Sequence, residues 1–210
     1  FYVMALGTGS SLTPVYEELI RRYEEKKLSF RNVVVFNSYE YYPLQKESSI
    51  RCINQLKERF LDHVDISEQN IFSLDGFVAQ NAVQDCCRLY EQRIKTFGGL
   101  DVALLGIGRM GNIAANEPGS GIQSVTRLIL IGNTSREEME NSGKTKESVP
   151  PCSLTMGIAT LLSAKAIYLT AWGEEKSEIM QKVVENGITD TLPASFLQTH
   201  PNAHVVLDLS

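Results

Sequence analysis

A glycine-rich segment at residues 106–120 holds the side chains whose types and spacing point most directly to chemistry. It follows the apolar run 102–105, which is typical of a buried parallel strand. Glycines allow the backbone of such a segment to approach a ligand closely. Asn112, Asn116 and Glu117 add amide and carboxylate groups. A carboxylate held there can transfer protons, and the alternative is one that only hydrogen-bonds local backbone.

The glycines of this segment also match the pattern of a dinucleotide-binding loop. Gly106, Gly108 and Gly111 spell G-x-G-x-x-G. That motif requires a full helix after the third glycine and an acidic residue about 20 residues further on, after the next strand. Pro118 ends any helix early, and the predicted strand 126–131 leads into no carboxylate. We therefore expect no nicotinamide cofactor, and we predict no other cofactor.

A second polar loop follows the first predicted strand. Thr8, Gly9, Ser10 and Ser11 offer backbone N–H groups and hydroxyls just before a helix. This combination suits a phosphate group. A capping turn with only a local role explains the same residues equally well. The loop is not a Walker A motif, because no Gly-Lys-Ser/Thr follows it.

Two further segments place charged or aromatic residues after predicted strands. Lys176 lies in the first turn of a predicted helix, where a lysine opposes the helix dipole and a bound phosphate would offset that cost. A solvated surface lysine is the alternative. Glu40 stands among Tyr39, Tyr41 and Tyr42, and we expect these tyrosines to pack under the loop.

The elements that must position these residues alternate between strands and helices. We predict strands at 1–6, 33–36, 71–74, 101–105, 126–131, 166–171 and 204–207, and helices at 13–27, 48–63, 81–97, 154–163 and from 172 to about 185. The order predicts an α/β fold: a three-layer, mostly parallel, doubly wound (Rossmann-like) sheet with helices on both faces. The loops after the strands, including 37–44, would then meet at one edge. The polar segment 134–146 would cover them as a lid.

The composition limits the class of protein. The chain has 210 residues, which fits one domain over 1–210, and its net charge of −5 argues against a nucleic-acid surface. No apolar run is long enough to cross a membrane. The four cysteines lack metal-site spacing and predict reduced thiols in a cytoplasmic protein. Because Phe1 already lies in a predicted strand, we expect a fragment lacking its N-terminal start.

Several motifs in order resemble the glucosamine-6-phosphate deaminase (isomerase) family over nearly the whole chain. They are Thr8-Gly9-Ser10-Ser11, Val35-Phe36-Asn37 with Glu40-Tyr41, Phe60-Leu61-Asp62-His63-Val64-Asp65-Ile66, Gly106-Ile107-Gly108, Asn116-Glu117-Pro118, Ser124-Val125-Thr126-Arg127-Leu128, Gly173 with Lys176, and Leu197-Gln198 with His200-Pro201. The 6-phosphogluconolactonases share the fold, but Asn116-Glu117-Pro118 looks like the deaminase branch. The resemblance implies ring opening of an amino-sugar phosphate, proton transfer between C1 and C2, and loss of ammonia.

The chain departs from this family at the positions of its acids and bases. Tyr39 stands where the family carries an aspartate, and Met110 and Asn112 stand where it carries aspartate and histidine. Glu117 is retained, and Glu40 could assist it. A family arginine on the phosphate falls near Asn141, so that partner is lost. Tyrosine is a poor base at neutral pH, and methionine and asparagine cannot shuttle protons.

Two hypotheses follow from this pattern. The first is a sugar-phosphate-binding protein with degenerate or altered catalysis, in which Thr8, Gly9, Ser10, Ser11, Gly106, Gly108 and Lys176 hold the ligand. The second is an active isomerase or deaminase that uses Glu117, with Glu40 or Tyr39 assisting. Whether the chain is an enzyme stays open at this point. A homo-oligomer, and a place within a longer polypeptide, are further expectations from the resemblance.

Overall fold

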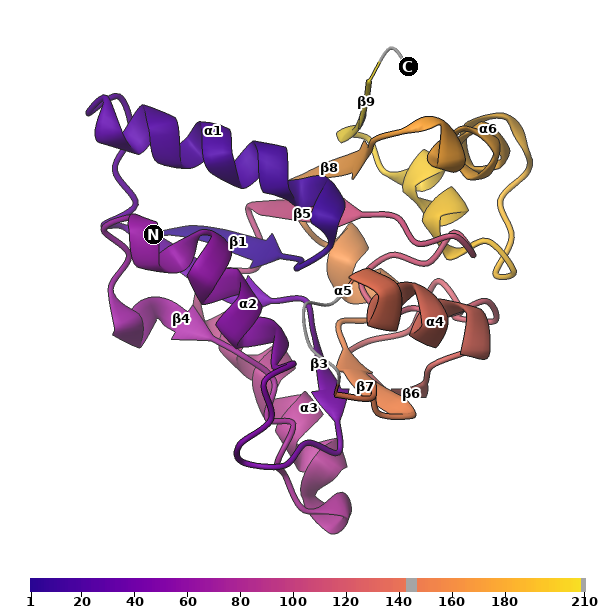
Figure 1. Ribbon diagram of the computed structural model, residues 1–210, viewed down its shortest axis with the longest axis horizontal. Helices are drawn as coiled ribbons and strands as arrows, with labels where there is room; N and C mark the ends of the chain where they lie inside the picture. The colour runs from indigo at the N-terminus through magenta and orange to yellow at the C-terminus, as the bar shows by residue number, and fades with distance from the viewer. Residues whose placement is uncertain (143–146, 209–210) are drawn as a thin grey trace.

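The computed structural model describes residues 1–142 and 147–208, and its larger sheet has six parallel strands (Figure 1). Their spatial order is β4-β2-β1-β5-β8-β9. The strands are β1 (Tyr2–Leu6), β2 (Val33–Asn37), β4 (Ile71–Phe72), β5 (Val102–Gly106), β8 (Ala166–Ala171) and β9 (Ala203–Leu207). The predicted α/β fold with a mostly parallel sheet is confirmed.

A smaller antiparallel sheet corrects three of the sequence-based predictions. It consists of β3 (Tyr39–Tyr42), β7 (Cys152–Thr155) and β6 (Arg127–Leu130), in that order. The segment 37–44 was predicted as a loop, yet its residues 39–42 form the strand β3. The strand near 126–131 exists but lies outside the parallel sheet. The predicted helix 154–163 is a strand followed by the short helix α5 (Ile158–Leu162).

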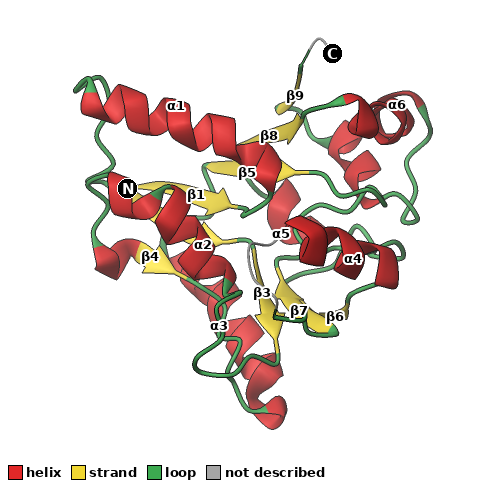
Figure 2. Ribbon diagram, viewed as in Figure 1, coloured by secondary structure: helices red, strands yellow, loops and turns green. Residues whose placement is uncertain are grey.

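Helices cover both faces of the parallel sheet (Figure 2). Alternate strand residues such as Met4 and Leu6 pack against α1 (Thr13–Glu24) and α2 (Cys52–Arg59). The intervening residues, such as Val3 and Ala5, belong to the core that includes α3 (Val83–Thr96), α5 and α6 (Ser177–Glu185). This alternation follows from the period of two along a strand, and it makes both faces of the sheet apolar.

The remaining helix, α4 (Asn133–Ser142), begins one residue before the predicted lid segment 134–146 and covers its first part. It lies beside the smaller sheet in Figure 1 and connects β6 to the segment that leads into β7. Residues 143–146 of the predicted lid lie outside the described residues. The polar segment is thus a helix over its first part, and its position decides what the candidate site contains.

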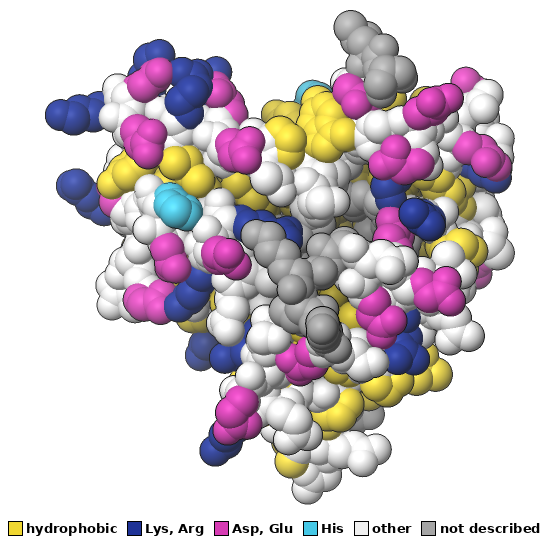
Figure 3. All heavy atoms as spheres, in the orientation of Figure 1, with side chains coloured by type: hydrophobic (Ala, Val, Ile, Leu, Met, Phe, Trp, Pro, Cys, Tyr) yellow, Lys and Arg dark blue, Asp and Glu magenta, His cyan; other side chains and the backbone are white. Residues whose placement is uncertain are grey.

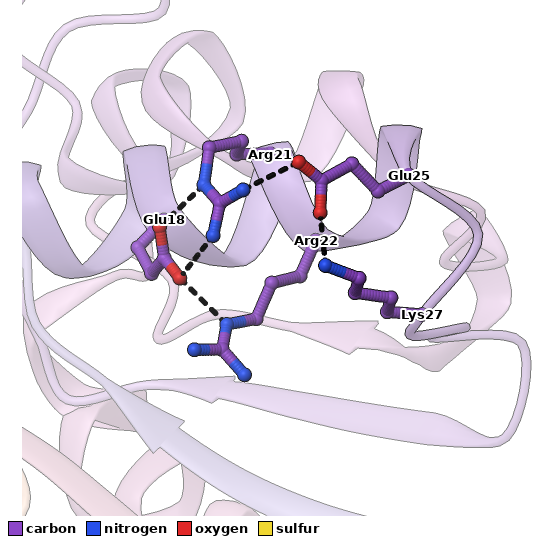
Figure 4. A network of polar contacts seen from close by, with 5 residues as sticks. All are labelled: Glu18, Arg21, Arg22, Glu25 and Lys27. Carbon is purple, nitrogen blue, oxygen red and sulfur yellow. Dashed lines mark hydrogen bonds and ion pairs between the residues drawn. The ribbon is translucent and has the colours of Figure 1, made fainter.

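The surface of α1 carries a network of exposed ion pairs. Glu18 bonds to Arg21 and Arg22, and Glu25 bonds to Arg21 and Lys27 (Figure 4). Exposed pairs of this kind contribute little to stability. Basic and acidic side chains are interspersed over the face drawn in Figure 3, so that face has no broad basic patch. Among the described residues, no helix has both the length and the hydrophobicity that crossing a bilayer requires.

The aromatic core under α1 fixes the loop that follows β1. Tyr16 is buried, stacks on Phe60 at a centroid distance of 5.0 Å, and donates from Oη to the Gly7 carbonyl at 2.6 Å. Tyr16→Phe removes only this hydroxyl and leaves the Gly7 carbonyl without its donor. We expect the free energy of unfolding to fall by about 1–1.5 kcal/mol. Urea denaturation measures this change, and a variant as stable as the wild type would contradict the anchoring role.

Candidate functional site

One pocket lies where the loops after several strands of the parallel sheet meet. Its lining includes the loop after β1, the end of β2 with β3, the glycine segment after β5, Lys176 and residues of α2 and α4. The polar and charged residues of the lining include Thr8, Ser10, Ser11, Ser38, Tyr39, Arg59, Asn112, Glu138, Glu140, Glu147 and Lys176. Carboxyl ends of parallel strands share one edge of a sheet, so the predicted convergence of these loops is found.

The loop Gly7–Ser11 packs directly on the end of β5. A Cβ atom on Gly106 would lie 2.3 Å from Oγ of Ser11, so only glycine allows the two segments to approach this closely. The Ser11 carbonyl accepts hydrogen bonds from Thr170 Oγ1, at 3.0 Å, and from Trp172 Nε1. At the other end of the loop, the Tyr16 hydroxyl donates to the Gly7 carbonyl. The predicted phosphate loop is therefore fixed at both ends before any ligand enters.

Lys176 reaches the same pocket and contacts a residue that the sequence did not indicate. It follows Gly173, whose φ of 87° is a left-handed conformation that favours glycine, and it precedes α6. Its Nζ lies 2.6 Å from Oε1 of Glu138 on α4. Oε2 of Glu138 accepts the backbone N–H of Arg109 at 2.9 Å. A lysine and a backbone amide, both suited to an anion, are thus occupied by a carboxylate from α4.

The glycine segment forms a tight turn, and its polar residues Asn112, Asn116 and Glu117 are buried. Gly111 has a φ of 73°, and its N–H donates to the Gly108 carbonyl at 3.0 Å. A Cβ atom on Gly108 would lie 2.0 Å from Oδ1 of Asn112. Met110 lies at the tip of this turn with 42% of its surface exposed, and it is not part of the pocket lining. The next elements after β5 are β6 and α4, so no helix begins at Gly111.

Glu117 lies behind Asn112, away from the pocket surface. Only 8% of Glu117 is exposed, and its Oε1 lies 3.4 Å from Nδ2 of Asn112. Nδ2 of Asn112 also lies 3.3 Å from Oγ of Ser135. Burial raises the pKa of the Glu117 carboxyl, and hydrogen bonds from Ser135 and Gly132 oppose that rise. Of this pair, Asn112 lines the pocket and Glu117 supports it.

The raised pKa of Glu117 gives a testable pH dependence. Below the unfolded-state pKa, near 4.3, the carboxyl is protonated in both states; above it, the native state holds its proton longer. The free energy of unfolding of the wild type therefore falls as the pH rises through the raised pKa. We expect Glu117→Gln to gain stability relative to the wild type as the pH rises above the unfolded-state value of about 4.3. Urea unfolding of both proteins at several pH values measures the difference in the free energy of unfolding. A difference that does not change with pH would contradict a raised pKa of Glu117.

Tyr39 lies in the pocket as a neutral phenol. Burial, together with the nearby Cys52 and Glu40, raises the pKa of Tyr39 well above its usual range. Its Oη accepts a hydrogen bond from Thr8 Oγ1 at 2.9 Å, and its ring packs edge-on against Tyr41 at 6.0 Å. Tyrosine packing beneath this part of the chain was expected. The hydroxyl of Thr8, predicted for a phosphate, instead donates to this phenol.

Glu40 faces away from the pocket and supports α2. It is fully buried, and Oε1 accepts the N–H groups of Cys52 at 2.8 Å and Tyr41 at 3.0 Å, while Oε2 accepts that of Ile53 at 3.3 Å. A carboxylate at the first turn of a helix satisfies N–H groups that have no partner within the helix. Glu40 does not line the pocket. Its position therefore differs from the assisting role expected from the sequence.

Two buried polar atoms in the lining have no hydrogen-bond partner among the described residues. They are Oγ of Ser38 and Oδ1 of Asn112. Buried polar atoms are nearly always hydrogen-bonded, so these two atoms are exceptions at the wall of the pocket. Ser38, Arg59 and Glu138 were missed by sequence reasoning. Arg59 and Glu138 carry no local signal, because long-range packing of α2 and α4 brings them to the pocket.

Arg127 supports the glycine-rich segment and does not line the pocket. Its Nη1 donates to Oδ1 of Asn116 at 2.9 Å and its Nη2 to Oγ of Ser120 at 2.8 Å. These bonds hold the glycine segment against β6. Asn141, the position where a family arginine was expected, is exposed near the end of α4 and does not line the pocket. Among the described residues, no cluster of histidine, cysteine or carboxylate side chains can hold a metal ion.

Comparison with known proteins shows the same similarity in sequence and in structure. A glucosamine-6-phosphate deaminase-like protein of Bacteroides thetaiotaomicron is 57% identical over 210 residues, and the chain spans 32% of its length. The glucosamine-6-phosphate deaminase of Shewanella halifaxensis is 39% identical over 206 residues, which cover 98% of this chain and 78% of the relative.

Solved structures extend the comparison. One described as a monomeric glucosamine-6-phosphate deaminase superposes with a TM-score of 0.93 and 34% identity, covering 99% of this chain and 86% of that one. A 6-phosphogluconolactonase from Thermotoga maritima shares the fold, with a TM-score of 0.74 and 20% identity over 98% of this chain and 84% of that one. The sequence model described as glucosamine-6-phosphate isomerases/6-phosphogluconolactonase matches residues 2–206. The chain therefore belongs to the glucosamine-6-phosphate isomerase/6-phosphogluconolactonase family.

Proposed function

We propose that this chain binds a sugar phosphate of the glucosamine 6-phosphate class and that its catalytic centre is degenerate. The observation that carries the proposal is the meeting of the Thr8–Ser11 loop, the Gly106 and Gly108 backbone and Lys176 in one pocket. In this proposal the loop and Lys176 hold the phosphate. In the same proposal Ser38 and Asn112, lining residues that each carry a polar atom without a partner, lie beside the sugar hydroxyls.

The proposed loss of catalysis rests on the side chains that would lie beside the sugar, none of which is a suitable base. Isomerisation between C1 and C2 of an amino sugar needs a base that can remove the C2 proton. Tyr39 is a neutral phenol with a raised pKa, and Asn112 cannot accept and return a proton. Glu117 is separated from the pocket surface by Asn112. Loss of one positioned acid or base typically costs about 10²–10⁴-fold in rate.

An active enzyme is the alternative, and one observation favours it. The raised pKa of Glu117 and its approach to Asn112 at 3.4 Å resemble the setting of a general acid or base. A small shift of Asn112 would bring that carboxyl to a ligand. Under this alternative, Glu117→Gln abolishes turnover and leaves binding within a few-fold of the wild type.

Isothermal titration calorimetry with glucosamine 6-phosphate tests the binding, and an ammonia assay on the same samples tests the chemistry. We expect saturable binding of glucosamine 6-phosphate, much weaker binding of glucosamine, and no ammonia above the background of the buffer. Absence of binding would overturn the proposed function. Ammonia release that depends on Glu117 would replace it with the alternative.

The length of the whole protein, its oligomeric state and its location in the cell are also proposals. The Bacteroides relative is about three times the length of this chain, so we propose that the domain works within a longer polypeptide. A homo-oligomer remains a prediction, and the structural neighbour at 34% identity is described as monomeric. All four cysteines are free thiols, which supports the proposed cytoplasmic location.

A further inference from the structure

The charged residues of the pocket give a phosphate little net attraction if Lys176 is its only cationic partner. Two basic side chains, Arg59 and Lys176, line the described part of the pocket together with three acidic ones, Glu138, Glu140 and Glu147. A phosphate monoester brings up to two further negative charges. Lys176 is already paired with Glu138 at 2.6 Å. One paired lysine is a weak attraction for such a dianion.

The other two carboxylates are held by neighbouring backbone and hydroxyl groups. Glu140 accepts the N–H of Val149 at 3.1 Å, and Glu147 accepts the hydroxyls of Ser48 and Ser49 at 2.6 and 2.9 Å. Among the described residues, Arg59 has no carboxylate within ion-pair distance, although it is only partly exposed. A cation placed in this way is suited to an anionic ligand.

The position of Arg59 connects it directly to the predicted phosphate loop. It is the last residue of α2, and its Nη1 donates to the carbonyl of Thr8, the second residue of Gly7–Ser11. A guanidinium group has five N–H donors in a planar fork, and among the described residues one of them is used, by the Thr8 carbonyl. The remaining donors can form the paired hydrogen bonds that phosphate oxygens accept.

We propose that Arg59 is the second cation of the phosphate site, an inference that rests on the proposed function. In this role it contacts the ligand phosphate beside the Thr8–Ser11 loop, and it supplies from α2 the positive charge that α4 does not provide, since α4 carries Glu138 and Glu140 toward the pocket. Arg59 thereby determines the preference of the pocket for a phosphorylated sugar over the same sugar without its phosphate.

The test compares glucosamine 6-phosphate with glucosamine, by calorimetry for the first and NMR titration for the second. For Arg59→Gln we expect binding of glucosamine 6-phosphate to weaken by about 10- to 100-fold, the range for losing a charged hydrogen bond, with glucosamine unchanged within about twofold. Lys57→Gln is the matched control, because Lys57 lies on the same helix, pairs with Glu68 and does not line the pocket. We expect it to bind both ligands as the wild type does.

Three outcomes would overturn the inference, and they are distinguishable. Equal binding of glucosamine 6-phosphate by Arg59→Gln and the wild type rejects Arg59 alone. Equal weakening of both ligands shows that Arg59 only shapes the loop, and also rejects it. No binding by the wild type rejects the proposed function and the inference together. If Arg59→Gln does not fold, Arg59→Lys serves instead: we expect a smaller loss, confined to the phosphorylated ligand, and no loss would reject the inference.

Discussion

Substitutions of Lys176 and Glu138 are expected to change sugar-phosphate affinity in opposite directions. Glu138 occupies Lys176 Nζ, the donor proposed for the phosphate, and also accepts the Arg109 N–H. A phosphate entering the pocket must displace this carboxylate or lie beside it. Lys176→Gln removes an attractive charge, and we expect binding of glucosamine 6-phosphate to weaken by about 10- to 100-fold. Glu138→Gln removes a competitor and a repulsion, and we expect binding to strengthen by roughly tenfold.

The opposite changes in affinity distinguish a phosphate site at this ion pair from a general loss of structure. A variant that only disturbed the fold would weaken binding whichever charge it removed. Glu137→Gln is the matched control, because Glu137 is exposed on the same helix and does not line the pocket. Calorimetric titrations of the four proteins give the affinities. Weaker binding by Glu138→Gln, or unchanged binding by Lys176→Gln, would contradict a phosphate site at this ion pair.

Restoring acid and base groups at two pocket positions is expected to raise turnover of glucosamine 6-phosphate strongly. Tyr39 and Asn112 both line the pocket, so Tyr39→Asp and Asn112→His place a carboxylate and an imidazole beside the ligand. The imidazole would lie next to Glu117, whose Oε1 already approaches the amide of Asn112. A carboxylate partner orients a histidine and favours its charged form. We expect the double variant to release ammonia at least about 100-fold faster than the wild type.

Met110 provides the internal control for this experiment. The family resemblance places an aspartate there too, but Met110 is 42% exposed at the tip of the turn and outside the pocket lining. We therefore expect Met110→Asp to leave turnover unchanged, alone or added to the double variant. A double variant that binds glucosamine 6-phosphate and stays as slow as the wild type would show that more than these side chains has been lost.

The parallel sheet and its site edge could be predicted because their signals are local. The apolar run before Gly106 and the helix after Thr13 each lie within one segment, and alternation of strands and helices fixes which ends meet. The predicted phosphate loop, Gly106, Gly108, Tyr39, Asn112 and Lys176 accordingly lie in one pocket. This much of the site follows from topology.

The smaller sheet could not be predicted, because its strands pair over long separations. β3 is four residues with Glu40 among tyrosines, which has no clean alternation, and its partner β7 lies more than 100 residues later. The apolar run after Cys152 is typical of a buried helix. It divides at Gly157, where a Cβ atom would lie 2.1 Å from the Ser124 carbonyl oxygen, a contact invisible in the sequence.

The roles of individual side chains were hidden for the same reason. Glu40 lies beside Tyr39 in the sequence, yet the alternation of a strand directs it to the first turn of α2, away from the pocket. Arg59 and Glu138 reach the pocket from helices whose orientation depends on the packing of the whole chain. Sequence patterns thus predicted which loops meet at the pocket, and the structure was needed to identify which charged residues line it.

We propose that the pocket holds a sugar phosphate without catalysing its isomerisation. Proton NMR of glucosamine 6-phosphate with the protein in D₂O tests both parts in one sample. We expect the sugar signals to broaden in proportion to protein concentration while the C2 proton signal keeps its intensity and no product forms. Loss of the C2 proton signal by exchange with deuterium would contradict the degenerate centre, and unchanged line widths would contradict the binding.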